Sequence, residues 1–405
     1  MFDPATLRAS RQPLVFALGV VGLAVVLTSA AVLGSKRGLV AVPTRTPRPD
    51  EILAKVEPVE PVAGVARPDA TSPPLADLPS ALARARHQVE AARRQGDPRF
   101  LGRAQAALAP WWDAAAPPDE VLLLRATIRQ GLHDFAGARV DLDALVVRRP
   151  DDAQALVTRA VVAMVTGDVD QAGADCARVG VLAGELLGTA CAAPLAARGG
   201  GARAAYDRLG ALILASAPGP VVAWATTARG ELARQLGDDR AAEGHFQAAL
   251  TMTPDDPYTL AQLADLLLDA GRAAEVDALL RDQQPDTLVL RRAIALRRLH
   301  RSEAAPLVAR LRAEIDASAA RGDDTHLRER ARYFLDVDPQ PAQALAAARG
   351  NWNLQREAID VRTLLEAAAA ASDPAAAAPA LTWLDAGAID DAVLTRARVH
   401  LEGTR

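Results

Sequence analysis

Histidines, cysteines and acidic residues are the side chains best suited to metal binding or catalysis, and their spacing favours neither. No two of the six histidines lie three or four residues apart, the spacing that puts two ligands on one helix face. The motifs HExxH, CxxC, GxSxG and GxGxxG do not occur in the sequence. We therefore expect no catalytic residue, no cofactor and no metal ion, and the sequence does not favour an enzyme.

Four pairs of neighbouring aspartates fit a structural role instead. They fall in predicted turns just before or at the start of helices, where a carboxylate accepts hydrogen bonds from exposed N–H groups and opposes the helix dipole. The pairs are Asp151-Asp152, Asp238-Asp239, Asp255-Asp256 and Asp323-Asp324.

Cys176 and Cys191 are the only cysteines in the sequence, and we predict that they lie on adjacent helices. Outside the cytoplasm such a pair can form a disulfide. Alternatively, both are small apolar side chains buried in the core. The sequence leaves both interpretations open.

The composition indicates a helical chain with closely packed interfaces. Of the 405 residues, 50% are hydrophobic but only 3% are aromatic, and 91 are alanine. Alanine, leucine and arginine favour helices, whereas a large enzyme core usually buries many aromatic side chains. The net charge is −4, and no domain has the basic excess of a nucleic-acid-binding protein. We predict an all-α fold and no nucleic-acid partner.

A long apolar segment near the N-terminus predicts a membrane anchor. Residues 12–35 carry no charge, and as a helix Leu14–Gly34 would span about 31 Å, the thickness of one hydrocarbon core. We assign 1–12 to a short tail and 13–35 to a single-pass transmembrane signal anchor. A cleaved signal peptide ending near Ala30 is the alternative, but this apolar run exceeds the roughly 7–15 residues usual for such peptides. Basic residues flank both ends, and the short basic tail slightly favours a cytoplasmic N-terminus.

Residues 36–79 are rich in proline, with nine prolines between Pro43 and Pro79. Such a segment cannot bury enough apolar area to fold, and it tends towards extended polyproline conformations. We predict a flexible, disordered linker that holds a soluble domain away from the membrane. The PVEPV sequence at 58–62 as a ligand for a proline-recognition domain is the less common alternative.

A repeat of about 34 residues follows the linker, and residues 223–254 give its clearest form. Small residues allow its two predicted helices to approach closely, one aromatic side chain fills the groove left by the next unit, and proline stops the second helix. The residues that carry this pattern are Gly230, Gly237, Ala242, Phe246, Ala249 and Pro254. The unit closely resembles a tetratricopeptide repeat (TPR), because these residue types stand at positions 8, 15, 20, 24, 27 and 32 of that repeat.

Units starting at Asp119, Ala153 and Pro257 keep the same register, and helix-breaking turns recur about every 35 residues. We expect these turns near Gly96, His133, Gly167, Gly200, Gly237, Gly271, Arg301, Val337 and Asp373. The resemblance implies a right-handed α-solenoid of antiparallel helix pairs. It would comprise a TPR array over 80–325 and TPR-like helices with a cap over 326–405.

Peptide ligands of TPR proteins often contact positions 2, 5, 9 and 12 of the first helices, which form a concave surface. Carried over to two units of this sequence, these positions define a candidate peptide groove: Trp224, Thr227, Glu231, Arg234, Tyr258, Ala261, Asp265 and Leu268. Trp224 and Tyr258 could anchor a peptide if they are exposed, or they could pack against adjacent helices. The Lys and Asn residues that bind carboxylate tails in chaperone-binding relatives are not matched.

The resemblance implies a non-catalytic scaffold or assembly factor that is tethered to a membrane and binds a protein or peptide partner through its solenoid. A structural or accessory subunit of a membrane or envelope complex, without peptide capture, is the alternative. Similar anchored repeat proteins belong to bacterial envelopes. We therefore expect a bacterial inner (cytoplasmic) membrane location, with 13–35 in the bilayer and the soluble part in the periplasm.

Overall fold

The computed structural model describes residues 77–322 and 325–403. Over these residues the chain forms twenty α-helices and two short 3-10 helices, with no β-strand. The predicted all-α fold is therefore confirmed for this part of the chain. The predicted tail, anchor and nearly all of the linker (1–12, 13–35 and 36–79) lie outside the described residues. No helix within the described residues is both long and apolar enough to cross a bilayer.

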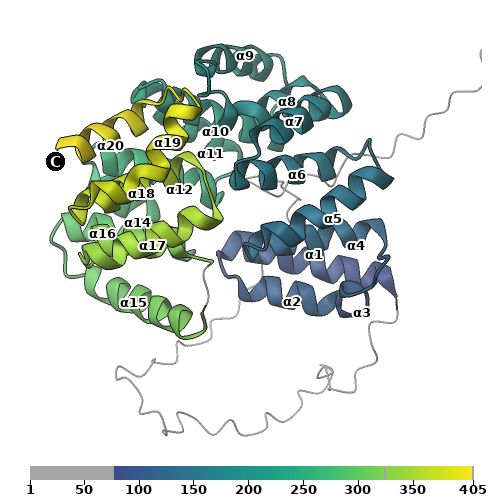
Figure 1. Cartoon of the computed structure of the whole chain (residues 1–405), viewed down its shortest axis with the longest axis horizontal. Helices are drawn as coiled ribbons and strands as arrows, with labels where there is room; N and C mark the ends of the chain where they lie inside the picture. The colour runs from purple at the N-terminus through teal and green to yellow at the C-terminus, as the bar shows by residue number, and fades with distance from the viewer. Residues whose placement is uncertain (1–76, 323–324, 404–405) are drawn as a thin grey trace, which may run out of the picture.

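Consecutive helices pair into hairpins that stack along the chain (Figure 1). The pairs are α1 (Leu78–Gln95) with α2 (Arg99–Ala107), α4 (Asp119–Gly131) with α5 (Phe135–Arg148), α6 (Ala153–Thr166) with α7 (Val169–Ala183), α8 (Glu185–Ala192) with α9 (Ala202–Leu214), α10 (Pro220–Gln235) with α11 (Asp239–Met252), α12 (Pro257–Asp269) with α13 (Ala273–Leu280), α14 (Asp286–Arg298) with α15 (Ala304–Ala320), and α16 (Leu327–Asp336) with α17 (Pro341–Leu354). The helical part ends with α18 (Ala358–Ala370), α19 (Ala378–Ala386) and α20 (Ala392–Gly403). Short helices α3 (Ala109–Trp112), η1 (Ala193–Leu195) and η2 (Pro374–Ala377) lie between them.

The predicted turns each fall between two of these helices. Gly167, Gly237 and Gly271 have φ angles of 88°, 79° and 73°, in the left-handed region that favours glycine. Three of the four predicted aspartate pairs supply a helix cap, and the fourth pair, Asp323-Asp324, lies outside the described residues. Asp256 accepts a hydrogen bond from the Thr259 N–H at 2.9 Å. Asp152 and Asp238 accept hydrogen bonds from the third following backbone N–H, at 3.0 and 2.9 Å. The turns predicted from the repeat spacing and these caps predicted from the aspartate pairs are therefore confirmed.

Small and large residues meet across the helix pairs, as the repeat pattern requires. Phe246 of α11 is fully buried, and a Cβ atom added at Gly230 of α10 would lie only 2.6 Å from its ring. The missing side chain at Gly230 thus makes room for the aromatic ring. Ala242 and Ala249, on either side of Phe246 in α11, are also fully buried.

A buried ion pair recurs in two successive hairpins at the same repeat position. Arg125 of α4 binds Asp141 of α5 at 2.6 Å, and Arg159 of α6 binds Asp175 of α7 at 2.7 Å. Each pair is bidentate, and both aspartates are almost completely buried. Because residues 34 apart make the same interaction, this Arg–Asp ion pair is a recurring contact that holds the first helix to the second.

The stacked hairpins wind so tightly that distant parts of the chain meet (Figure 1). The segment between α19 and α20 forms a β-bridge to the segment after η1, where Asp390 N–H donates to the Ala197 carbonyl at 3.0 Å. Elsewhere, Arg93 of α1 lies 3.6 Å from the carboxylate of Asp256, which caps α12. The described part of the chain is therefore a closed array rather than an open arc.

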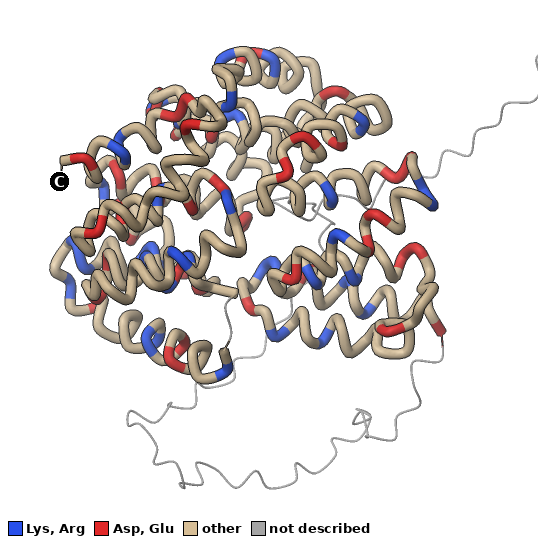
Figure 2. The backbone as a smooth tube through the Cα atoms, viewed as in Figure 1, with Lys and Arg blue, Asp and Glu red and all other residues tan. Residues whose placement is uncertain are grey.

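Helix α15 is the exception to this close packing. Every other second helix from α5 to α17 packs along the following first helix, whereas α15 makes only sparse contact with α16. It lies at the edge of the array in Figure 1. Both signs of charge are interspersed along the helices, without a block of one sign (Figure 2).

Candidate functional site

The predicted peptide groove lies on α10 and α12, on the inner side of the closed array, and it is not an open surface. Its buried members are Trp224, Thr227, Arg234, Asp265 and Leu268, and its half-buried members are Glu231, Tyr258 and Ala261. Only 8% of the Trp224 surface is exposed, because this side chain packs in a hydrophobic cluster with residues of α6 to α9. Trp224 therefore packs against adjacent helices and is not exposed to anchor a peptide.

Hydrogen bonds within the chain occupy much of the polar surface of this face. The hydroxyl oxygens of Thr227 and Thr259 lie 2.8 Å apart, and the Thr259 hydroxyl donates to the Asp256 carboxylate at 2.7 Å. The Tyr258 hydroxyl donates to the carboxylate of Glu231. These polar groups already have hydrogen-bond partners within the chain, and a peptide would have to replace those partners.

Asp265 of α12 is the centre of a buried ion-pair network that extends over three first helices. Its carboxylate accepts hydrogen bonds from Arg291 of α14 at 2.6 Å and from Arg332 of α16 at 2.8 Å. Burial alone would raise the pKa of Asp265, but the two guanidinium groups hold it well below its usual range. Asp265 is therefore an ionised structural residue and not a proton donor.

Asp269, one turn further along α12, joins helices that are even further apart in the sequence. It binds Arg234 of α10, and Arg362 of α18 donates to both of its carboxylate oxygens at 2.6 and 2.7 Å. Residues 269 and 362 are separated by nearly three repeat lengths. The superhelix is thus narrow enough for α18 to reach across its inner side and contact α12.

The loop between α17 and α18 completes this closure. Arg328 of α16 donates to Glu357 of this loop at 2.7 Å and to Asp360 of α18 at 2.6 Å. The Arg356 N–H, also in the loop, donates to the Val165 carbonyl of α6 at 2.8 Å. The Glu357 carboxylate is also close enough to raise the pKa of Glu231. The inner face that the repeat pattern assigned to a peptide is therefore filled by the chain's own helices and this loop.

A pH-dependent difference in stability is expected from Glu231. Burial raises its pKa to about 7, with Glu357 adding to the effect and the Tyr258 hydrogen bond opposing it. The native state therefore holds this proton more tightly than the unfolded chain, whose carboxyl titrates near 4.5. The stability that this provides is complete below about pH 4.5 and is lost as the pH rises through about 7.

Glu231→Gln keeps an acceptor for the Tyr258 hydroxyl but cannot ionise. We expect the variant to be more stable than the unmodified protein at pH 8, by on the order of 1–3 kcal/mol, and to match it at pH 4.5. Urea unfolding at the two pH values measures this difference. A variant that is equally stable or less stable at pH 8 would contradict the assignment of a half-buried carboxyl that retains its proton.

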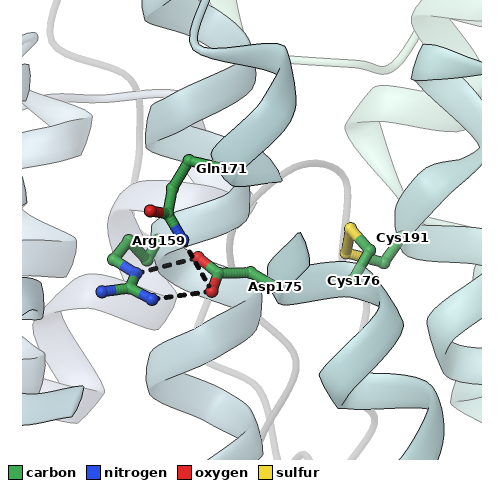
Figure 3. Close-up of a disulfide and its surroundings, with 5 residues drawn as sticks. All are labelled: Arg159, Gln171, Asp175, Cys176 and Cys191. Atoms are coloured by element: carbon green, nitrogen blue, oxygen red, sulfur yellow. Dashed lines mark hydrogen bonds and ion pairs between the residues drawn. A yellow bond between two sulfur atoms is a disulfide. The ribbon is translucent and has the colours of Figure 1, made fainter. Parts of the chain in front are cut away.

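Cys176 of α7 and Cys191 of α8 form a disulfide, with their Cα atoms 5.4 Å apart (Figure 3). Both residues are almost completely buried. The helices they join also approach closely at two glycines, since a Cβ at Gly188 would lie 2.5 Å from the Gly180 Cα. Asp175, the residue before Cys176, points to the opposite side of α7 and binds Arg159 of α6 (Figure 3). Neighbouring residues of α7 thus fix this helix to both of its neighbours.

Loss of this disulfide should lower the free energy of unfolding by about 3 kcal/mol, the loop entropy expected for a closed loop of about 15 residues. Urea unfolding of Cys176→Ala/Cys191→Ala, with and without reductant, tests this expectation. Reductant should destabilise the unmodified protein to a similar extent and leave the double variant unchanged. If reductant does not change the unfolding midpoint of the unmodified protein, the disulfide does not contribute to its stability.

A cavity of about 590 Å³ lies where α15 separates from α16. Its wall is the face of α15 that carries small residues and Val308, its end is the turn between α14 and α15, and its far side includes Tyr333 of α16. The lining residues are Arg297, Arg301, Ser302, Ala304, Ala305, Val308, Ala309, Arg312, Tyr333 and Asp338. The repeat pattern did not predict this cavity, because it assumes that every second helix packs on the next first helix.

The recurring Arg–Asp pairs were also missed in the sequence, although a signal was present. Arg125 and Arg159 are 34 residues apart, and so are Asp141 and Asp175. Charged residues on helices are usually solvated, so only their exact agreement with the repeat length distinguishes these pairs from surface charges.

Comparisons with known proteins find solved structures that are only remotely similar to this chain. The chain is similar to the solved structure of a tetratricopeptide repeat protein from Parabacteroides merdae ATCC 43184, with 14% identity, coverage of 58% of this chain and 92% of that chain, and a TM-score of 0.37. It is also similar to the TPR domain of P58(IPK), with 16% identity, coverage of 80% and 97%, and a TM-score of 0.21. No protein-family model matches the sequence, and no curated protein matches it. The case for a repeat array therefore rests on the hairpins and contacts of this chain.

Proposed function

We propose that this chain is a non-catalytic protein-interaction scaffold, tethered to the bacterial inner membrane through residues 13–35, with its helical array in the periplasm. Its partner binds the outer surface of the array, because the inner face is occupied by the chain's own ion pairs. The observation that carries the proposal is a set of exposed apolar side chains that recurs with the repeat.

These side chains are Val147 of α5, Val181 of α7 and Leu214 of α9, which we call the outer apolar positions. They are 83%, 87% and 88% exposed, and they stand 34 and 33 residues apart near the ends of three successive second helices. Singly exposed apolar residues are ordinary, whereas exposed apolar residues that share one surface mark an interaction site. In a repeat array, equivalent positions of neighbouring units present one extended surface to a partner.

Replacement of the three outer apolar positions by serine tests the proposal. Crosslinking in intact membranes, followed by purification of the full chain, should recover a specific polypeptide. Its yield should fall at least about tenfold in the triple variant, because burial of each Val or Leu contributes roughly 1.5–3 kcal/mol. The matched control is Val399→Ser, which changes an exposed apolar residue of α20 outside this set. An unchanged yield in the triple variant would refute the assignment of the partner to this surface.

The disulfide supports the periplasmic part of the proposal, since disulfides persist in oxidising compartments and are rare in the cytoplasm. The uncharged segment 13–35 and the proline-rich linker supply the tether and the spacer. A phosphatase reporter that is active only in the periplasm, fused after Arg405, tests the orientation. Activity is expected in this fusion, and an inactive phosphatase combined with a fluorescent cytoplasmic reporter would overturn the placement.

A structural or accessory subunit of an envelope complex is the second candidate, and the closed inner face favours it. A protein that does not capture peptides has no need of an open groove. The two candidates differ in what the crosslinked partner contributes. A short segment of the partner should bind on its own if the chain is a peptide-binding scaffold, whereas only the folded partner should bind if the chain is an accessory subunit.

A further inference from the structure

The cavity between α15 and α16 combines unpaired positive charge with an apolar wall. Within the described residues, neither Arg297 nor Arg301 has an ion-pair partner, and both are exposed at its edge. Arg312 is different, because it pairs with Asp316 at 3.0 Å and with Asp338 at 3.4 Å. The chemistry of the cavity therefore suits a segment that carries carboxylates beside small apolar side chains.

The packing around the cavity differs from the packing between the other successive hairpins. In each of the other hairpins from α4 to α17, the second helix covers the next first helix. Here α15 stands off, and the space between the helices is lined by Ala304, Ala305 and Val308 on one side and by Tyr333 on the other. The cavity is open to solvent at its edge, so a further segment can enter it.

We propose that residues 50–62 of this same chain bind in this cavity. Their sequence is DEILAKVEPVEPV, which carries four carboxylates, one lysine and seven apolar side chains or prolines other than alanine. In this arrangement Glu57 and Glu60 would pair with Arg297 and Arg301, and Val59 between them would contact the α15 wall. The prolines favour an extended backbone, so little conformational freedom is lost on binding.

The length of chain before α1 is sufficient for this contact. The last residue of α1 is followed by Gly96, which lies against Pro285 at the start of α14. The 18 residues of α1 and the 13 of α14 are about 27 and 20 Å long, so the start of α1 is at most about 50 Å from the cavity. The twenty residues from Glu57 to Asp77 can reach about 66 Å when extended.

This contact would draw the linker back along the array. The spacer available between the membrane anchor and the array would then be 36–49 instead of 36–79. Binding of residues 50–62 therefore determines how far the array stands from the membrane, independently of which partner the outer surface binds.

The sequence supplies its own reporter for this binding, because Lys36 and Lys55 are its only lysines. A lysine-specific endoprotease can cut the full chain only after these two residues. We expect cleavage after Lys55 to be about tenfold slower in the unmodified protein than in Arg297→Glu/Arg301→Glu. This factor applies if the bound form outnumbers the unbound form about ten to one, because only the unbound form is cut. Cleavage after Lys36 should be the same in both proteins, which controls for protease activity and for detergent.

The matched control is Arg240→Glu/Arg349→Glu, which reverses two exposed arginines on other helices and should leave protection of Lys55 intact. Restored protection is expected when Arg297→Glu/Arg301→Glu is combined with Glu57→Arg/Glu60→Arg. Equal cleavage after Lys55 in the unmodified and Arg297→Glu/Arg301→Glu proteins would overturn the proposal. Protection that disappears on tenfold dilution would also overturn it, because the occupant would then belong to a second copy.

Discussion

An Asp265→Ala variant is expected to lose about 3–5 kcal/mol of its free energy of unfolding, the cost of removing one partner from a buried ion-pair network. Arg291 and Arg332 both donate to this carboxylate, at 2.6 and 2.8 Å, and Arg291 is almost completely buried. Without Asp265 these two guanidinium groups would repel each other in a poorly solvated space. Urea unfolding followed by circular dichroism measures the change, and partial unfolding of α12 to α16 at 25 °C is a stronger form of the same result.

The control for this prediction is Asp385→Ala, which removes an ion pair with Arg398 at the surface. Both side chains of that pair are largely exposed, so the expected loss is below about 1 kcal/mol. Similar losses in the two variants would mean that the inner network is as well solvated as the surface, contrary to the closed array.

Phe246→Ala is expected to have an effect of similar size, about 3–5 kcal/mol, because it leaves a cavity in the largest hydrophobic cluster. Phe246 is fully buried between α10 and the next hairpin. Thermal unfolding should show the loss as a lower Tm with an unchanged far-ultraviolet spectrum at 20 °C.

Two glycine variants test whether Gly230 exists to accommodate this ring. Gly230→Ala places a Cβ 2.6 Å from Phe246 and should destabilise the protein by about 1–3 kcal/mol. Gly244→Ala is the matched control in α11, where nothing lies within 4 Å of the added Cβ, and it should stabilise the helix by up to about 1 kcal/mol. Stabilisation by both substitutions would contradict the packing at Gly230.

The sequence predicted the hairpins because their determinants are local. Glycines such as Gly167 and Gly237 mark turns that need a left-handed backbone, and Asp152 and Asp238 cap the helices that follow. These features act within a few residues, so they are readable in a single sequence. The regular 34-residue spacing then assigns each helix to a pair.

The burial of the candidate groove could not be predicted in the same way. Whether Trp224 or Asp265 faces solvent depends on how tightly the superhelix winds, and this is decided by contacts such as Arg362 with Asp269, 93 residues apart. Each repeat adds a small rotation, and small differences accumulate over several units. The gap beside α15 has the same origin, since no local motif specifies how closely one hairpin lies on the next.

The disulfide could be predicted from the sequence only in part. The sequence placed Cys176 and Cys191 on adjacent helices, but the spacing alone did not decide between a bond and two buried thiols. Their pairing depends on the direction of both side chains, which the close approach of α7 and α8 at Gly180 and Gly188 provides.

We propose that this protein binds its partner with the outside of a closed array. A photo-crosslinking amino acid introduced separately at Ala261, on the inner face, and at Val181, on the outer face, tests it in native membranes. We predict a crosslink to a distinct polypeptide from position 181, and only crosslinks within the chain from position 261. A partner crosslinked from position 261 and not from position 181 would return the binding site to the inner groove.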